Sequence, residues 1–254
     1  MAKIVVFDSG LGSISIIKEI KKIMKTDIVY FADQKNYPYG NKSQAQIASI
    51  IKKTINMLEE KFTPDVIVVA SNTPSLMLNL QTGKIIDVKP PLKLAQKKSK
   101  SKKIGILATK ASVNSKGLEN YVKENNIPKS YKIFKINGSN LVDLVESGKF
   151  LNNKKYCKKI IKKSLDDYII TEKIDVITLS STHLLFLKTL LEKEFPQVEF
   201  IDPGSLVAKK IFLKIKNKQP KRNSLKIFTS GDIINFKNKL NKIGIKNKIN
   251  YLST

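Results

Sequence analysis

Short apolar runs alternate with amphipathic stretches along the chain, and this rhythm restricts the fold more than any other feature. Apolar side chains recur at helical spacing between residues 47 and 58 and between residues 156 and 169. Runs rich in Ile and Val are typical of buried parallel strands, and they occupy residues 4–7, 28–31, 66–70, 104–108, 176–179 and 200–201. The alternation predicts an α/β fold with parallel sheets, which bind ligands at the carboxyl ends of their strands.

The composition excludes several other classes of protein. The chain has 254 residues, of which 41% are hydrophobic, so it is neither disordered, collagen-like nor a small disulfide scaffold. Its single cysteine, Cys157, has no partner for an internal disulfide and suits a reducing compartment. The apolar stretch at the N-terminus is too short for a secretory signal and no apolar run is long enough to span a membrane, so we expect a cytoplasmic protein.

The charge is strongly positive, at +26, because 47 Lys and Arg residues face 21 Asp and Glu residues. Arg222 is the only arginine, whereas sites that read DNA depend on the planar fork of Arg. The lysines fall on the polar side of nearly every expected helix. We therefore interpret them as solvated faces and expect no nucleic-acid partner. The basic run 96–103 reads as a hinge or linker that divides the chain in two.

Each half contains the same local pattern. The run 66–70 ends in Ser71-Asn72-Thr73, and the run 176–179 is followed by Ser180 and Ser181-Thr182-His183. An apolar helical stretch comes next in both cases. The pattern indicates a weak internal duplication, with the alternative that these hydroxyl residues are ordinary helix caps.

Two further strand ends carry similar chemistry. The run 4–7 ends in Asp8-Ser9, and the run 104–108 ends in Thr109 with Ser112 close behind. Helix N-termini favour anions through exposed N–H groups and the helix dipole. Four such ends favour a pocket for a small anionic molecule over four capped helices without a ligand.

Seven motifs, in order along the chain, resemble the glutamate racemase family. They are Phe7-Asp8-Ser9-Gly10-Leu11-Gly12, Tyr37-Pro38-Tyr39-Gly40-Asn41-Lys42-Ser43, Val68-Val69-Ala70-Ser71-Asn72-Thr73-Pro74-Ser75, Leu141-Val142-Asp143-Leu144-Val145-Glu146-Ser147-Gly148, Ser181-Thr182-His183, Ile201-Asp202-Pro203-Gly204 and Phe228-Thr229-Ser230-Gly231-Asp232. They cover essentially the whole chain. Any one of them is weak, but together they are specific.

The resemblance implies two three-layer α/β domains related by a pseudo-twofold, with parallel sheets and an interdomain cleft. We place the domains at 1–98 with 207–254 and at 99–206. The C-terminal segment, a short strand from Phe228 and a final helix, would return to the first domain. The resemblance further implies a cytoplasmic homodimer that interconverts L- and D-glutamate without cofactor or metal, supplying D-glutamate for peptidoglycan.

The resemblance also implies the residues of the site. The family uses two cysteines as its acid and base, and both positions are serine here, Ser71 and Ser181; Cys157 is no substitute. Asp8 would assist the first base, His183 the second, and Glu146 would support His183. With Ser112 added from the strand-end argument, the expected substrate-binding residues are Asp8, Ser9, Tyr39, Gly40, Asn72, Thr73, Ser112, Thr182 and His183.

The serines leave four hypotheses of function open, because a serine hydroxyl needs an adjacent base while a free cysteine is already a few per cent thiolate. The first is a glutamate racemase with an altered base. The second is a non-catalytic protein that binds a small acidic amino acid, glutamate or aspartate. The third is a serine hydrolase or decarboxylase, against which the two-residue spacing of Ser181 and His183 argues. The fourth is a nucleic-acid role.

Overall fold

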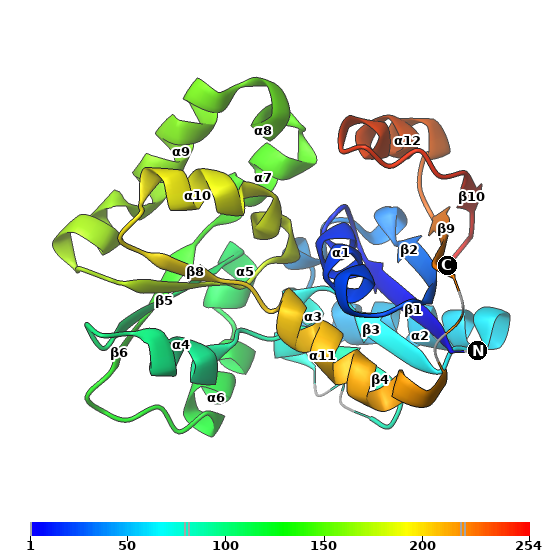
Figure 1. Ribbon diagram of the computed structural model, residues 1–254, viewed down its shortest axis with the longest axis horizontal. Coiled ribbons are helices and arrows are strands. Elements are labelled where there is room, and N and C mark those ends of the chain that lie inside the picture. Colours follow the sequence, from blue (N-terminus) through cyan, green and yellow to red (C-terminus); the bar gives the residue numbers. More distant parts are fainter. Residues whose placement is uncertain (1, 79, 81, 219, 221) are drawn as a thin grey trace. The chain divides into compact units, whose positions relative to one another are not determined.

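The computed structural model describes residues 2–254 except 79, 81, 219 and 221. The chain forms two compact units, Met1–Val88 with Gly204–Thr254 and Lys89–Pro203, which we call unit 1 and unit 2. Each unit has its own parallel sheet with helices packed against it (Figure 1). The prediction of two α/β domains with parallel sheets is confirmed.

Unit 1 is built on a six-stranded sheet of order β10-β9-β2-β1-β3-β4, and every neighbouring pair is parallel. Its strands are β1 (Lys3–Asp8), β2 (Asp27–Ala32), β3 (Val66–Val69), β4 (Ile85–Asp87), β9 (Ser224–Thr229) and β10 (Ile249–Tyr251). Its α-helices are α1 (Ser13–Ile23), α2 (Gln44–Phe62), α3 (Asn72–Met77), α11 (Gly204–Ile215) and α12 (Ile233–Lys242), and three 3-10 turns accompany them, η1 (Gln34–Asn36), η2 (Tyr39–Asn41) and η5 (Lys216–Lys218). Helix α2 buries Ile47, Ile51 and Leu58 against alternate residues of the central strands, as expected where a helix stripe meets one face of a sheet.

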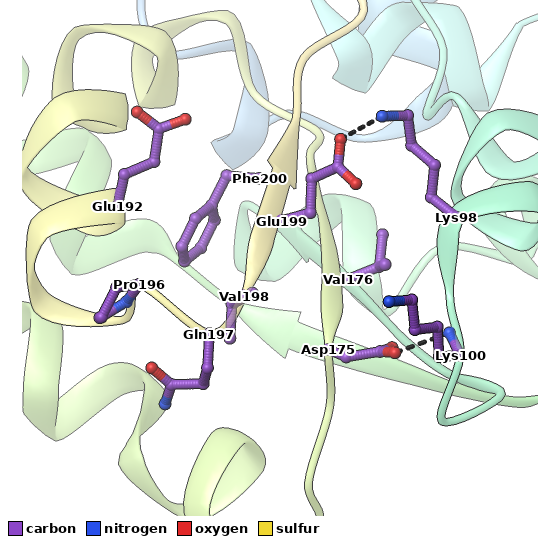
Figure 2. A pocket seen from close by; sticks show the side chains of 10 residues that line it. All are labelled: Lys98, Lys100, Asp175, Val176, Glu192, Pro196, Gln197, Val198, Glu199 and Phe200. Carbon is purple, nitrogen blue, oxygen red and sulfur yellow. Dashed lines mark hydrogen bonds and ion pairs between the residues drawn. The ribbon is translucent and has the colours of Figure 1, made fainter.

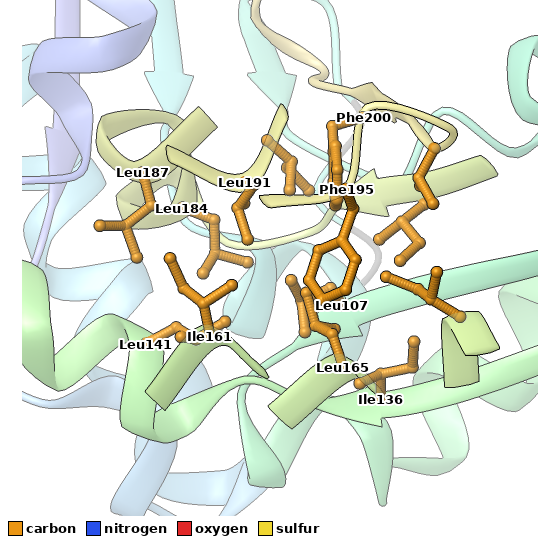
Figure 3. Packing of buried hydrophobic residues seen from close by; sticks show 14 of the residues in the cluster. Leu107, Ile136, Leu141, Ile161, Leu165, Leu184, Leu187, Leu191, Phe195 and Phe200 are labelled. Carbon is orange, nitrogen blue, oxygen red and sulfur yellow. The ribbon is translucent and has the colours of Figure 1, made fainter. Parts of the chain in front are cut away.

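Unit 2 is built on a four-stranded parallel sheet of order β6-β5-β7-β8. Its strands are β5 (Lys103–Ala108), β6 (Lys132–Asn137), β7 (Val176–Leu179) and β8 (Glu199–Ile201). Its helices are α4 (Leu92–Lys98), α5 (Lys110–Val113), α6 (Lys116–Glu124), α7 (Ser139–Glu146), α8 (Lys149–Asn152), α9 (Lys154–Asp166) with the π turn η3 (Asp167–Thr171), the 3-10 helix η4 (Thr182–Leu187) and α10 (Lys188–Glu194). Figure 3 shows the main core, in which Leu141, Ile161, Leu165, Leu184 and Leu191 pack together.

The two sheets share one strand order. Without β9 and β10, the sheet of unit 1 reads β2-β1-β3-β4, and the sheet of unit 2 reads β6-β5-β7-β8. Chain order and sheet position therefore match strand for strand, with β3 corresponding to β7. This agreement supports the internal duplication that the two serine motifs indicate.

The structure adds strands that the apolar runs do not reveal. All six predicted strands are present, together with β4, β6 and β10, and β9 begins at Ser224, earlier than the Phe228 start expected from the sequence. The helix predicted between residues 156 and 169 runs into a π turn that ends at Thr171.

The boundaries between the units differ from the predicted ranges, 1–98 with 207–254 and 99–206. Helix α4 belongs to unit 2 because Ala95 is buried with Ile104 and Val176. The chain returns from unit 2 to unit 1 before Gly204, because α11 is one continuous helix that packs on α1. The basic run 96–103 is therefore the end of α4, a turn and the first residue of β5 rather than a linker.

Among the described residues, no helix combines the length and the apolar character that crossing a membrane requires.

Candidate functional site

The carboxyl ends of β1 and β3 lie side by side, because these strands are neighbours and Phe7 is paired with Val69. Asp8 is the last residue of β1 and Ser9 follows it, and Ser71, Asn72 and Thr73 follow β3. The 3-10 turn η2, which carries Tyr39 and Gly40, contacts α3. We call these seven residues the first cluster, and all of them were predicted as site residues.

Asp8 is buried and holds the loop that leads into α1. Its Oδ1 accepts the N–H of Gly10 at 3.0 Å, and its Oδ2 accepts the N–H of Ser13 at 2.9 Å. These two bonds fix the orientation of the carboxylate. Ser13 is the first residue of α1, so Asp8 also provides the negative charge that a helix N-terminus favours.

Ser71 and Ser181 have nearly the same backbone conformation. Ser71 precedes α3 with φ −140° and ψ 127°, and Ser181 precedes η4 with φ −144° and ψ 131°. Neither side chain makes a capping hydrogen bond to its helix, although serine at this position usually does. The capping alternative therefore fails at both serines, and the conformation presents two hydroxyls that their own helices do not use.

Tyr39 is held by a buried carboxylate that the sequence analysis did not single out. Its hydroxyl donates to Asp33 Oδ2 at 2.9 Å, Ser230 Oγ donates to Asp33 Oδ1 at 3.0 Å, and Asn36 Nδ2 donates to both oxygens. Burial, then the charge of Asp33 and its hydrogen bond, and last the charge of Asp8, raise the pKa of Tyr39 well above its ordinary value. The signal for Asp33 was its place directly after β2, at the same sheet edge as Asp8.

In unit 2 the structure joins His183 to Glu146. His183 lies in η4 and Glu146 is the last residue of α7, and these two elements contact each other. Nε2 of His183 lies 2.7 Å from Glu146 Oε1, and both side chains are buried. Because a carboxylate accepts, Nε2 carries the proton in this pair, which fixes the tautomer and orients the ring.

Ser112, Glu146, Ser181, Thr182 and His183 make up what we call the second cluster. Strands β5 and β7 are neighbours, with Leu107 paired with Leu179, so the segments after them share one sheet edge. Thr109 is an ordinary cap, since its Oγ1 accepts the N–H of Ser112 at 3.3 Å and lies 3.0 Å from Ser112 Oγ. The capping alternative therefore accounts for Thr109.

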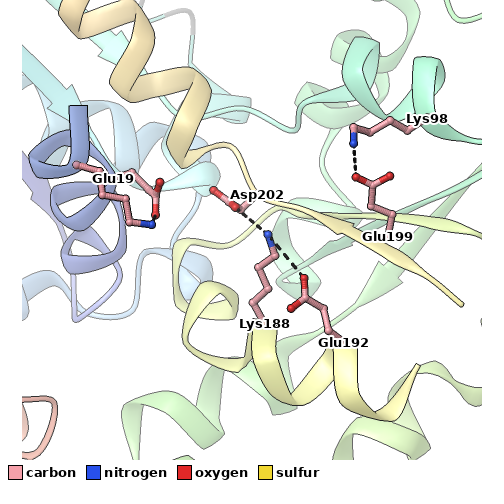
Figure 4. A network of polar contacts seen from close by, with 7 residues as sticks. Glu19, Lys98, Lys188, Glu192, Glu199 and Asp202 are labelled. Carbon is pink, nitrogen blue, oxygen red and sulfur yellow. Dashed lines mark hydrogen bonds and ion pairs between the residues drawn. The ribbon is translucent and has the colours of Figure 1, made fainter. Parts of the chain in front are cut away.

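A cavity of unit 2 lies apart from this edge, whereas a cluster of ion pairs lies just after the carboxyl end of β8. A cavity of about 430 Å³ lies at the amino ends of β7 and β8, lined by Asp175, Glu199 and Lys98 among others (Figure 2). Ligands of parallel sheets bind at the opposite ends of the strands. Lys188 lies 3.4 Å from Asp202 and 3.8 Å from Glu192, which ties the end of β8 to α10 (Figure 4).

Cys157 is buried in the core of unit 2, where desolvation raises the pKa of its thiol. A buried thiol of raised pKa is a poor nucleophile. Among the described residues, no group of three or more His, Cys, Asp or Glu side chains is placed to hold a metal ion.

Several known proteins resemble this chain in sequence or in structure. No family model matches the chain. It is 31% identical over 219 residues to the glutamate racemase of Persephonella marina, covering 84% of this chain and 81% of that protein. A crystal structure of a Bacillus anthracis glutamate racemase isoform superposes with a TM-score of 0.84 at 23% identity, covering 99% of this chain and 97% of the other.

Another solved structure, a Francisella tularensis glutamate racemase in complex with D-glutamate, has a TM-score of 0.81 at 23% identity and covers 100% of this chain and 97% of that chain. These solved structures share the fold of two parallel-sheet units. The Persephonella marina protein is 31% identical to this chain over most of both sequences. The chain belongs to the glutamate racemase family.

Proposed function

We propose that this protein interconverts L- and D-glutamate by proton transfer between two bases, without a cofactor. The observation that carries the proposal is the matched pair Ser71 and Ser181, each extended at a corresponding strand end with a hydroxyl that caps no helix. Each serine belongs to a cluster that also contains a base, Asp8 in the first cluster and His183 in the second.

The substrate follows from family membership and from the polar residues of the two clusters. The Francisella relative was crystallised with D-glutamate. In this chain the expected contacts are Asp8, Ser9, Tyr39, Gly40, Asn72, Thr73, Ser112, Thr182 and His183. Hydroxyl and backbone N–H groups suit the two carboxylates of glutamate, and carboxylate and amide oxygens suit its ammonium group.

The reaction needs one proton removed from the α-carbon and one returned to the opposite face. One base takes the α-proton, the electron pair of the broken C–H bond passes into the adjoining carboxyl group, and the second group then donates a proton to the α-carbon. The enzyme is left with the two protonation states exchanged, ready for the reverse reaction. A thiol does this work near neutral pH, whereas a serine hydroxyl requires a neighbouring base.

Asp8 and His183 are those neighbouring bases in our proposal, acting through the serines or directly. The contact with Glu146 holds Nε2 of His183, so its proton exchange runs through Nδ1. Glu146 thus positions the imidazole and stabilises the imidazolium that forms when a proton is taken up.

A non-catalytic protein that binds an acidic amino acid is the second candidate, and a specific observation favours it. Both thiol positions are serine, and both oxygens of Asp8 already accept backbone N–H groups. A base bound in this way has less freedom to reach a substrate proton. The two candidates share the ligand and differ in the chemistry.

Calorimetry with L-glutamate, D-glutamate and the two aspartates tests the ligand that both candidates share. We expect binding of glutamate, weakened about tenfold by Thr182→Val, which removes one hydrogen-bonding hydroxyl at nearly constant volume. Thr171→Val is the matched control, because Thr171 is exposed at the end of η3 and belongs to neither cluster. If none of the four amino acids binds at millimolar concentration, the proposed substrate is wrong.

The family resemblance also supports a cytoplasmic homodimer that supplies D-glutamate for peptidoglycan. These remain proposals, as does the expectation that no nucleic acid is bound.

A further inference from the structure

Val88, the last residue before the chain leaves unit 1, is bound on both sides by side chains of α3. Its N–H donates to Ser75 Oγ at 3.2 Å, and its carbonyl accepts Asn72 Nδ2 at 2.9 Å. Ser75 Oγ in turn donates to the carbonyl of Ser71 at 2.7 Å. Ser75, Asn72 and Val88 are all buried, with at most 3% of each residue exposed.

These bonds fix the direction in which the Asn72 amide points. Because Val88 offers a carbonyl, only the NH₂ group of Asn72 can face it, and a flipped amide would set two acceptors against each other. Oδ1 of Asn72 is consequently directed elsewhere, and within the described part of the chain it is buried and accepts no hydrogen bond. A buried acceptor without a donor costs free energy until a donor reaches it.

We propose that Ser75 is a positioning residue that orients Asn72 toward the substrate. Its hydroxyl ties the backbone of Ser71 to Val88, and Val88 in turn holds the Asn72 amide. Oδ1 then accepts a hydrogen bond from the ammonium group of an amino acid. This inference rests on the proposed function, in which Asn72 contacts glutamate, and it adds a residue that touches no substrate itself.

A double-mutant cycle on glutamate binding tests whether Ser75 acts through Asn72. We expect Ser75→Ala to raise the Kd for L-glutamate about tenfold and Asn72→Ala to raise it at least as much. The double variant should bind no more weakly than Asn72→Ala alone, because the two residues form one chain of contacts. Independent, additive effects would overturn the proposal.

Two further variants control the cycle. Ser75→Thr keeps the hydroxyl, which can still bond the carbonyl four residues back, and it should retain the affinity within about twofold. Ser164→Ala is the matched control. Ser164 Oγ donates to the carbonyl of Ile160 at 2.9 Å, which is the same bond to a carbonyl four residues back, in a helix outside both clusters. The Kd of this variant for L-glutamate should not change. If Ser75→Ala does not fold, Ser75→Cys replaces it with a weakly bonding group of similar size.

Hydrogen exchange of the Asn72 side-chain amide, followed by NMR, needs no ligand. We expect slow exchange in the natural protein and fast exchange in Ser75→Ala. Unchanged exchange in Ser75→Ala would contradict the positioning role even if glutamate binds. If exchange becomes fast in Ser75→Ala but the natural protein binds no glutamate, Ser75 still positions Asn72 and the proposed function is refuted.

Discussion

Some residues of the candidate site can be predicted from sequence motifs, and others become evident only in the structure. The sequence motifs predicted Asp8, Ser71, Ser181, His183 and Glu146 as site residues, and the structure places Nε2 of His183 2.7 Å from Oε1 of Glu146. Residues that position other site residues are harder to predict, because their role depends on a partner distant in sequence.

Asp33 shows this difficulty. One of its partners, Ser230, lies 197 residues away, and no spacing rule links the two. Ser75 stands inside a recognised motif, yet its bond to Val88 depends on the path of the chain after β4. Both residues become visible only when the segments that carry them are folded together.

Replacing Tyr39 by Phe should flatten the alkaline loss of stability. The pKa of Tyr39 is raised in the folded protein, so above about pH 10 the unfolded chain loses this proton while the folded chain keeps it. The free energy of unfolding therefore falls as pH rises past that point, and Tyr39→Phe removes this contribution.

Urea unfolding at pH 9 and pH 11 measures the effect. Tyr39→Phe should also lower stability at neutral pH by about 1 kcal/mol, because Asp33 loses a donor. Tyr251→Phe, at an exposed side chain, is the control and should leave both quantities unchanged. An equal alkaline slope in Tyr39→Phe and the natural protein would show that Tyr39 does not titrate as described.

The elements show which parts of the fold an apolar pattern predicts. Strands at the centre of the sheets, such as β1, β3, β5 and β7, are buried on both faces and read as continuous apolar runs. The three that the pattern missed, β4, β6 and β10, lie at sheet edges, where strands are short or carry lysines.

The basic run 96–103 was interpreted as a linker, but it contains a structured turn between α4 and β5. Asp175, just before β7, accepts hydrogen bonds at 2.7 Å from Ser99 Oγ, Ser101 Oγ and the N–H of Lys100, and at 2.8 Å from the N–H of Ser101. A carboxylate 74 residues from its nearest donor in sequence gives no local signal. The turn is therefore a fixed part of unit 2.

Asp175→Asn should destabilise the protein at neutral pH and make it less sensitive to acid. Burial alone would raise the pKa of Asp175, but the bonds from Ser99, Ser101 and Lys100 outweigh it and lower the pKa. A lowered pKa stabilises the fold above about pH 4, and this stability is lost as pH falls through the pKa of the folded protein.

We expect a loss of about 1 kcal/mol at pH 7, since the group is partly exposed. The difference between Asp175→Asn and the natural protein should shrink toward pH 3. Asp167→Asn is the control, because Asp167 is exposed and its side chain makes no hydrogen bond in the described structure. A difference that stays constant with pH would contradict the account.

In the whole molecule, one strand order occurs twice, and each copy places a serine at the end of its third strand. Many of the lysines behind the net charge of +26 lie on the exposed faces of helices. On α9, Lys154, Lys158 and Lys162 are exposed while Ile161 and Leu165 are buried, as expected for solvated faces. In the proposed function, the chemistry depends on the residues after the two strand ends rather than on the net charge.

Deuterium uptake at the α-carbon of glutamate in D₂O tests the central claim that the two serine positions are where protons are exchanged. We expect slow uptake from both enantiomers by the natural protein. Ser71→Cys with Ser181→Cys should be about 10²–10⁴-fold faster, the usual contribution of a positioned acid or base. Ser71→Ala with Ser181→Ala is the matched control and should be no faster than the natural protein.

Each outcome has a definite meaning. Uptake by the natural protein that is lost in Asp8→Asn or His183→Asn would establish a racemase that works with serine. Uptake by the double cysteine variant alone would leave a binding protein with the geometry of a racemase. No uptake by either protein, although both are folded and bind glutamate, would contradict the account.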